Sequence, residues 1–240
     1  MSVLAAGTLG PSAYWYLTRA TGAVAILLLT LTVALGVVDV GRWTSPRWPR
    51  FVIDSLHRSA SLLAVAFLAL HVLTAVLDSF APISLAAAFI PFVSSYRPFW
   101  LGLGAVAFDL LLALVITSMM RRRFGHAAWR TTHWLAYACW PIALLHGLGT
   151  GSDVKSGWLL VLTVGCVLTV IAAVIARVAN GWPENARERV AALGATAAFA
   201  LFLLLWLPSG PLGEEWARRS GTPPSLLPHA TKASAKGARR

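Results

Sequence analysis

The chain has 240 residues, of which 58% are hydrophobic and only 12% charged, and its formal net charge is +11. This composition excludes an ordinary soluble globular protein and is typical of a membrane protein. The basic residues lie between apolar runs rather than on one face, so the charge indicates membrane topology and not nucleic-acid binding. Cys139 and Cys166 both fall inside apolar runs, so no disulfide framework is expected.

Six apolar runs are long enough to cross a bilayer. They cover residues 16–38, 52–77, 99–120, 129–149, 157–179 and 189–207. Isolated runs of this length satisfy their backbone polar groups only as helices. We therefore predict an all-α fold, a polytopic membrane helical bundle of about six transmembrane helices, located in the cell membrane as a multi-pass protein.

The chain changes character after Pro208, where Pro, Gly, Ala and Lys dominate. Such a composition predicts disorder, because it offers too little apolar surface to bury. The predicted organisation is thus a membrane domain over residues 14–208 and a disordered basic tail over residues 209–240.

Basic residues are distributed unequally between the two sides of the predicted membrane domain. One side, formed by the loops after the second and fourth spans, holds only Arg97 and Lys155, with Arg19 near the start of the first span. The loops on the other side are much richer in arginine. By the positive-inside rule the richer side is cytoplasmic, which places both termini outside. The tail opposes this topology with six basic residues, partly offset by Glu214 and Glu215. The richer side carries Arg42, Arg47, Arg50, Arg58, Arg121, Arg122, Arg123, Arg130, Arg177, Arg187 and Arg189.

Four histidines interrupt the second and fourth apolar runs. His57 and His71 are 14 positions apart, and His133 and His146 are 13 apart. In a helix these separations are about 21 and about 20 Å, so each helix carries two imidazoles near opposite ends of a roughly 30 Å hydrocarbon layer. The two spans run in the same direction. Depth therefore pairs His57 with His133 on the cytoplasmic side and His71 with His146 on the outer side.

The two spacings differ in the direction they give the side chains. Fourteen steps of about 100° fall about 40° short of four turns, so His57 and His71 share a face. Thirteen steps fall about 140° short, so His133 and His146 do not share one on an ideal helix. Two explanations remain open: a local distortion at Pro141, which lies between them, or different orientations of two bound cofactors around the helix.

A single membrane histidine is often only a partner in a hydrogen bond across a helix interface, a contact worth about 0.6 kcal/mol on average. Two near-equal pairs on two co-directional spans favour paired ligands of two large planar cofactors instead. Zinc or copper also binds imidazole, but a metal transport site is expected at one depth and with carboxylates. His126 and His229 lie in a basic loop and in the tail, so neither is a candidate ligand. The sequence has no C-x-x-C-H motif for covalent haem attachment.

Two further charged residues lie in or beside the predicted spans. Arg19, at the outer rim of the first span, is a candidate partner of a cofactor carboxylate, because Arg forms bidentate charge-assisted bonds. The alternative is an interfacial arginine that snorkels to the membrane surface. Asp109 is near the middle of the third span, where a charge is costly. Structural hydrogen bonding and proton relay are both compatible with it.

These features together resemble the ferric reductase-like transmembrane family, the di-haem core shared by ferric reductases, NADPH oxidases and the haem subunit of methionine sulfoxide reductase systems. The resemblance covers about residues 14–180 and lies in H-x13-H at His57/His71 and H-x12-H at His133/His146. It also includes the arginine-rich loop before the second pair, the segment HGLGTGSD that begins at His146, and the opening YLTRATG at Tyr16.

The resemblance implies a b-type cytochrome whose four paired histidines ligate two haem b groups, with iron as the ligated metal. It implies electron transport from a cytoplasmic donor to an outer acceptor, as the membrane subunit of an oxidoreductase. No G-x-G-x-x-G in a strand–helix setting is present, so the expected donor is a separate flavoprotein or a quinol. The alternatives are a haem-free transporter or channel whose histidines bind a metal ion or relay protons, and a non-catalytic membrane partner of another redox protein.

Overall fold

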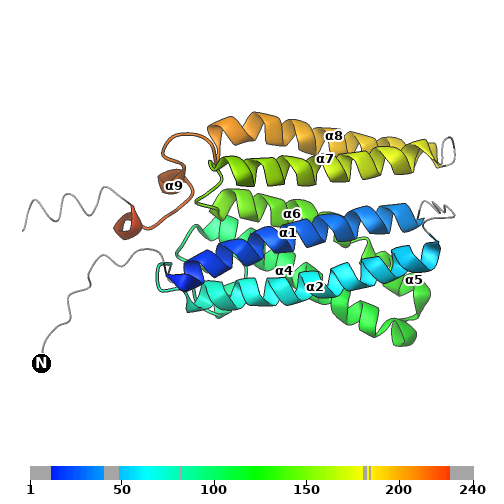
Figure 1. The fold of residues 1–240 in the computed structure, drawn as a ribbon, viewed down its shortest axis with the longest axis horizontal. Coiled ribbons are helices and arrows are strands. Elements are labelled where there is room, and N and C mark those ends of the chain that lie inside the picture. The colour runs from blue at the N-terminus through cyan, green and yellow to red at the C-terminus, as the bar shows by residue number, and fades with distance from the viewer. Residues whose placement is uncertain (1–11, 41–48, 82, 181–182, 184, 228–240) are drawn as a thin grey trace, which may run out of the picture.

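The computed structural model describes residues 12–40, 49–81, 83–180, 183 and 185–227. Across these residues the regular secondary structure is helical throughout (Figure 1). The elements are α1 (Ala13–Val40), α2 (Arg50–Leu77), α3 (Ala86–Phe89), α4 (Pro98–Met119), α5 (Arg121–His133), α6 (Ala136–Thr150), α7 (Gly157–Ala179), α8 (Ala186–Ser209), α9 (Trp216–Arg219) and the 3-10 helix η1 (Pro224–Leu226).

Five of these helices, α1, α2, α4, α7 and α8, are long and apolar enough to cross a membrane. Their ends lie within three residues of the predicted runs. The prediction of an all-α polytopic bundle is confirmed. The fourth predicted span, residues 129–149, differs because it is not one helix. It consists of the end of α5 and the 15 residues of α6, with a break at Trp134 and Leu135.

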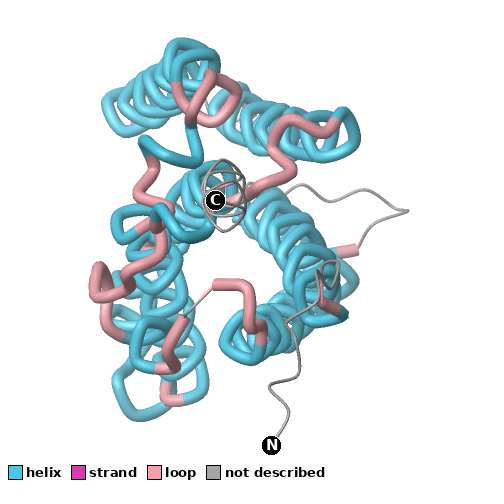
Figure 2. Tube along the Cα trace, turned by 90° about the vertical axis from the view of Figure 1, so that its left-hand side faces the viewer, coloured by secondary structure: helices cyan, strands magenta, loops and turns pink. Residues whose placement is uncertain are grey.

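The long helices lie side by side along the longest axis of the molecule (Figure 1). Helix α1 packs against α2, α6 and α7, while α4 packs against α6. Viewed end-on, α7 and α8 form a pair at one side of the bundle (Figure 2). The buried core lies where α6 meets these two helices, and its members are Trp140, Leu144, Leu148, Val154, Cys166 and Leu203. Helices α2 and α6 run in the same direction, as the sequence predicts for the histidine-bearing spans.

The bundle has one arginine-rich end, formed by the start of α2, by α5 and by the facing ends of α7 and α8. Arg42 and Arg47 of the predicted basic loop lie outside the described residues. At the opposite end, Arg97 is not a surface charge: it is only 4% exposed. Its guanidinium donates to the carbonyl oxygens of Gly149 and Thr150, at 3.0 and 3.1 Å. Burial lowers the pKa of Arg97 below its ordinary value.

The structure describes the predicted tail as far as Leu227, and this part contains α9 and η1. Trp216 of α9 donates from its indole nitrogen to the Gly149 oxygen at 3.1 Å, and its ring packs against the Trp100 and Trp206 rings. A composition rich in Pro, Gly and charged residues suggests disorder because it does not reveal that single apolar side chains, such as Trp216 and Leu212, pack against the bundle. The remainder of the predicted tail, with His229, lies outside the described residues.

Candidate functional site

The two histidines of α2 lie on one face of that helix and point at α1. The Nδ1 atom of His57 is 3.0 Å from the Thr32 oxygen, and Nδ1 of His71 is 2.8 Å from the Thr18 oxygen. A carbonyl oxygen only accepts, so each Nδ1 carries the hydrogen and each Nε2 keeps a free lone pair. This hydrogen-bond pattern typically orients a histidine for metal ligation through Nε2.

The other two histidines differ from each other. His146 in α6 donates from Nδ1 to the oxygen of Trp100 in α4, at 2.9 Å. The Nδ1 atom of His133, at the end of α5, is buried without a hydrogen-bond partner. Its ring instead stacks on the Trp129 indole, with centroids 5.0 Å apart and an interplanar angle of 27°. Three imidazoles are thus oriented by backbone carbonyls and the fourth by an aromatic ring.

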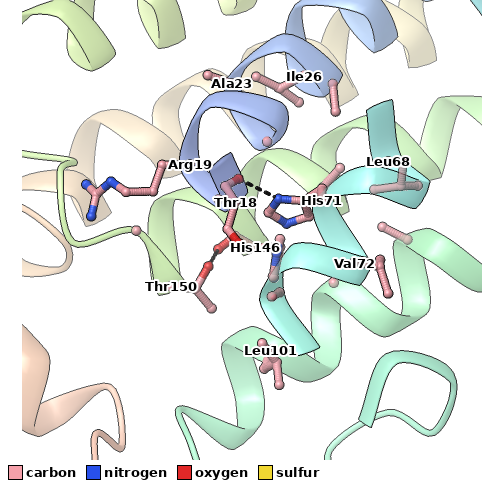
Figure 3. A pocket seen from close by; sticks show the side chains of 18 of the residues that line it. Thr18, Arg19, Ala23, Ile26, Leu68, His71, Val72, Leu101, His146 and Thr150 are labelled. Carbon is pink, nitrogen blue, oxygen red and sulfur yellow. Dashed lines mark hydrogen bonds between the residues drawn. The ribbon is translucent and has the colours of Figure 1, made fainter. Parts of the chain in front are cut away.

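The structure brings together the two pairs that depth predicts. The ring centroids of His57 and His133 are 6.4 Å apart, and those of His71 and His146 are 6.2 Å apart. Figure 3 shows the second pair, with His71 and His146 on neighbouring helices. Metal–nitrogen distances are about 2.0–2.1 Å, so separations of this size would leave room for one metal ion between the two rings of each pair. Both pairs would therefore be able to hold a metal ion between their imidazoles.

The break between α5 and α6 explains how residues 13 apart come to share a face. Around it, backbone hydrogen bonds run to the third preceding residue, from Trp134 to Thr131 and from Ala138 to Leu135. A 3-10 turn winds about 120° per residue instead of about 100°. Five such steps from His133 to Ala138 add about 100°, which reduces the 140° shortfall to about 40°. The distortion therefore lies before Pro141, which sits inside α6.

A cavity of about 300 Å³ surrounds the His71–His146 pair. Its walls come from α1, α2, α4, α6 and α7 and are mostly apolar, with Arg19 at its edge (Figure 3). The hydroxyl of Thr18, which also lines this cavity, is buried without a hydrogen-bond partner. Two facing imidazoles, an apolar surround and polar groups at one edge fit a planar apolar cofactor with carboxylate side chains, which is the chemistry of haem.

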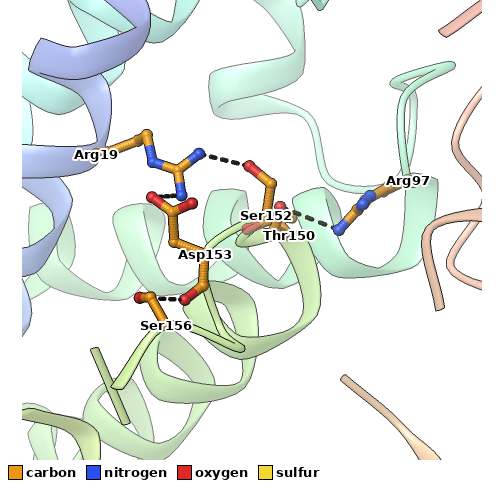
Figure 4. A network of polar contacts seen from close by, with 6 residues as sticks. All are labelled: Arg19, Arg97, Thr150, Ser152, Asp153 and Ser156. Carbon is orange, nitrogen blue, oxygen red and sulfur yellow. Dashed lines mark hydrogen bonds and ion pairs between the residues drawn. The ribbon is translucent and has the colours of Figure 1, made fainter. Parts of the chain in front are cut away.

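Arg19 takes part in a polar network at the edge of this cavity (Figure 4). Its guanidinium forms an ion pair with Asp153, donates to the Ser152 hydroxyl, and lies 4.0 Å from the centroid of the Trp15 ring. These contacts occupy part of its five donor hydrogens. The sequence indicates Arg19 as a candidate but does not indicate its partners. The signal that was available is the segment after His146, which carries the serine and the aspartate.

The remaining candidates play no visible part in the paired sites. Asp109 is partly exposed on α4 and, within the described residues, makes neither a hydrogen bond nor an ion pair. His126 lies against Trp129, outside both pairs. In the described part of the chain, no group of three or more His, Cys, Asp or Glu side chains is placed to hold a metal ion. A pair of histidines would nevertheless be enough to hold a haem, whose own ring nitrogens would complete the coordination of the iron.

Comparison with known proteins gives one match. The model of the family "Ferric reductase like transmembrane component" matches residues 21–148, which is more than half of the chain and includes all four paired histidines. No curated protein and no solved structure matches significantly. The family supports a role in membrane electron transfer, and its members usually bind haem. With its helical bundle and its paired histidines inside the matched region, the chain belongs to the ferric reductase-like transmembrane family.

Proposed function

We propose that this protein is a b-type cytochrome that holds two haems within residues 14–208. His57 and His133 are the ligands near the arginine-rich end, and His71 and His146 are the ligands near the opposite end. The observation that carries the proposal is the separation of the ring centroids in both pairs, 6.4 and 6.2 Å, which suits one metal ion between two imidazoles.

When bound, haem supplies one-electron transfer between the two ends of the bundle, in cytochrome fashion. The protein's own contribution is to hold the two sites about 21 Å apart along α2. It also fixes the tautomers of three imidazoles through backbone carbonyls and surrounds the outer pair with apolar side chains that exclude water.

Arg19 is proposed as a partner for a carboxylate of the outer cofactor. It lies on the cavity edge, and the hydrogen bonds with Asp153 and Ser152 leave donors of its guanidinium unused. Asp153 would then hold the guanidinium in place rather than compete for it, because a planar guanidinium can serve two carboxylates from different sides.

Electrons are proposed to enter at the arginine-rich end, which the positive-inside rule makes cytoplasmic. This end presents Arg50, Arg58, the cluster 121–123 and Arg130, a basic surface suited to an acidic flavoprotein or an anionic flavin. A membrane that is negative inside favours electron exit by roughly 2.3 kcal/mol per 100 mV. The outer acceptor is proposed to be ferric iron or a flavin-bearing protein.

A membrane quinol is the second candidate donor, and a pocket favours it. The pocket has a volume of about 740 Å³ and lies between α6, α7 and α8. Trp134, next to His133 in sequence, lines it together with Tyr137 and Phe199. At its rim, Nη1 of Arg177 is buried without a hydrogen-bond acceptor. An apolar tail and a head group with carbonyl oxygens would satisfy both features.

The primary test is a visible spectrum of the purified protein before and after dithionite, with the haem content measured as pyridine haemochrome. We expect sharp reduced b-type bands and about two haems per chain. Protein purified in a folded state and without these bands, even after haemin is supplied, would refute the proposal and favour the haem-free transporter or channel.

Direction and donor are tested in proteoliposomes of known orientation with ferricyanide trapped on the His71–His146 side. A reduced flavin or a short-chain quinol is supplied on the other side. We expect haem reduction followed by loss of ferricyanide. If the haems become reduced but ferricyanide persists, transmembrane transfer is ruled out. If the Arg177→Leu variant loses the quinol-driven rate but keeps the flavin-driven rate, the donor binds in the pocket between α6, α7 and α8. If the rate is unchanged, the donor binds at the basic surface.

A further inference from the structure

Each of the three hydrogen-bonded imidazoles lies directly against a glycine of the neighbouring helix. A Cβ atom added to Gly104 would come within 2.5 Å of Cε1 and Nδ1 of His146. One added to Gly22 would lie 2.9 Å from Cε1 of His71. The equivalent distance from Gly36 to Cε1 of His57 is 3.3 Å. Any larger residue at Gly104 or Gly22 would therefore displace the ring.

The glycines stand in a fixed register to the accepting carbonyls. In an α-helix the carbonyl of residue i points toward residue i+4, so the side chain at i+4 guards the approach to that oxygen. A glycine there lets an imidazole reach the carbonyl edge-on. All three acceptors have glycine at i+4: Thr18 with Gly22, Thr32 with Gly36, and Trp100 with Gly104.

The register also runs through the sequence of α1. Gly22 and Gly36 are 14 residues apart, the same spacing as His57 and His71 in the antiparallel helix α2. Each glycine meets the histidine at its own depth. A periodic pair in one helix thus mirrors a periodic pair in its neighbour, which indicates a built arrangement and not a chance gap in packing.

The fourth imidazole has neither a carbonyl partner nor a facing glycine among the described residues. His133 has no carbonyl partner for Nδ1 and rests on Trp129, whose indole nitrogen donates to the Ser118 hydroxyl at 3.3 Å. In the outer pair, both imidazoles donate to a backbone carbonyl and lie against a glycine. In the inner pair, His57 with His133, only His57 does so. The two pairs therefore differ in how many of their imidazoles have a carbonyl partner and a facing glycine.

We propose that Gly22, Gly36 and Gly104 are positioning residues that tune the two haems to different midpoint potentials. An imidazole that donates from Nδ1 to a carbonyl is a more basic ligand at Nε2 and stabilises the ferric state. With two such ligands, the haem at His71 and His146 has the more negative midpoint potential. The haem at His57 and His133 has the less negative one. This inference rests on the proposed function.

The test combines redox titration with electron paramagnetic resonance of the ferric haems. His146→Ala is used to assign the outer signals. In Gly22→Ala we expect the outer midpoint potential to shift in the positive direction and its g values to change. In Gly104→Ala, with the closest contact, we expect haem affinity at that site to fall about 10–100-fold. Gly36→Ala, with the mildest contact, should shift only the inner potential. Gly165→Ala, where a Cβ would meet nothing within 4 Å, is the matched control.

Helix destabilisation cannot produce these losses, because alanine favours a helix over glycine by about 1 kcal/mol. The inference is overturned if the outer haem has the less negative potential in the wild type. It is also overturned if Gly22→Ala and Gly36→Ala both keep the potentials and g values of Gly165→Ala, whatever happens in Gly104→Ala. A wild-type protein that never binds two low-spin haems refutes the proposed function itself, so the two failures are distinguishable.

Discussion

Helix α2 and the α5–α6 segment present two histidines each, but they do so by different means. Helix α2 is continuous over 28 residues and spaces its histidines by 14. The α5–α6 segment spaces them by 13 and contains a 3-10 stretch. A 3-10 residue rises about 2.0 Å instead of about 1.5 Å. Five such steps and eight α-helical ones span about 22 Å, against about 21 Å for α2.

The rotation between the two histidines is also nearly equal in the two segments, because in each it falls about 40° short of a whole number of turns. Winding therefore compensates for the missing residue in both depth and direction. The comparison teaches that histidine spacing on a membrane helix has to be read together with local winding. Residue counts alone would place His133 and His146 on different faces.

The largest predicted effect comes from removing one ligand of each pair. The double variant His71→Ala/His133→Ala should lose both low-spin haems, whereas His71→Ala or His146→Ala alone should lose only the outer one. The reason is that each pair consists of two imidazoles, and among the described residues no third imidazole contacts either pair. Haem-to-protein ratios of about two, one and none would be measured, with His126→Ala as the control. One intact low-spin haem in the double variant would show that the pairing is wrong.

Changing the histidine spacing should affect α2 and the α5–α6 segment differently. Deleting Ala66 reduces the spacing between His57 and His71 from 14 to 13 positions in a continuous helix. One of the two histidines then turns about 100° away from its partner, and one haem should be lost. Inserting an alanine after Leu135 together with Pro141→Ala gives the other segment the α2 spacing. That variant should keep both haems, measured by reduced-minus-oxidised spectra. Equal losses in the two variants would contradict the compensation by winding.

Trp129 is predicted to support only the inner site. Stacking of this kind contributes about 0.5–1.5 kcal/mol, so Trp129→Leu should weaken haem binding at His57 and His133 by up to about tenfold. The outer haem should be unaffected. Haemin titration of the apoprotein measures both affinities, and Trp134→Leu, whose side chain is 57% exposed, is the control. A loss at the outer site instead would mean that Trp129 acts through the whole bundle.

The smallest effect is expected at Arg19. Its ion pair with Asp153 is partly exposed, and such pairs contribute about 1 kcal/mol or less. Arg19→Gln should retain the outer haem but make its potential more negative, because a cation near the cofactor is removed. Asp153→Asn leaves the cation and should make it more positive. If both variants shift the outer potential in the same direction, the guanidinium does not interact with the cofactor carboxylate.

The sequence predicts the large features because they depend on composition and spacing. Helix ends, the co-directional spans and the depth of each histidine all follow from apolar runs and residue counts. The oriented tautomers do not, since any residue offers a backbone carbonyl and Thr18, Thr32 and Trp100 share no side-chain chemistry. Pro141 suggests a distortion but does not locate it at Trp134. The glycine spacing in α1 is visible in the sequence but has meaning only beside α2.

The hydrogen bonds between Arg97 and the end of the described chain have a consequence for the order in which the protein is assembled. Arg97 Nε donates to the Thr222 hydroxyl, and its backbone N–H donates to the Gly221 oxygen. Residues 221 and 222 reach this position only after α8 has been inserted. The contacts of the His57–His133 pair described above come from α1, α2, α4 and α5. If the protein holds two haems as proposed, we therefore expect the inner site to form first during synthesis and the outer site to form last, once residues 221 and 222 reach Arg97.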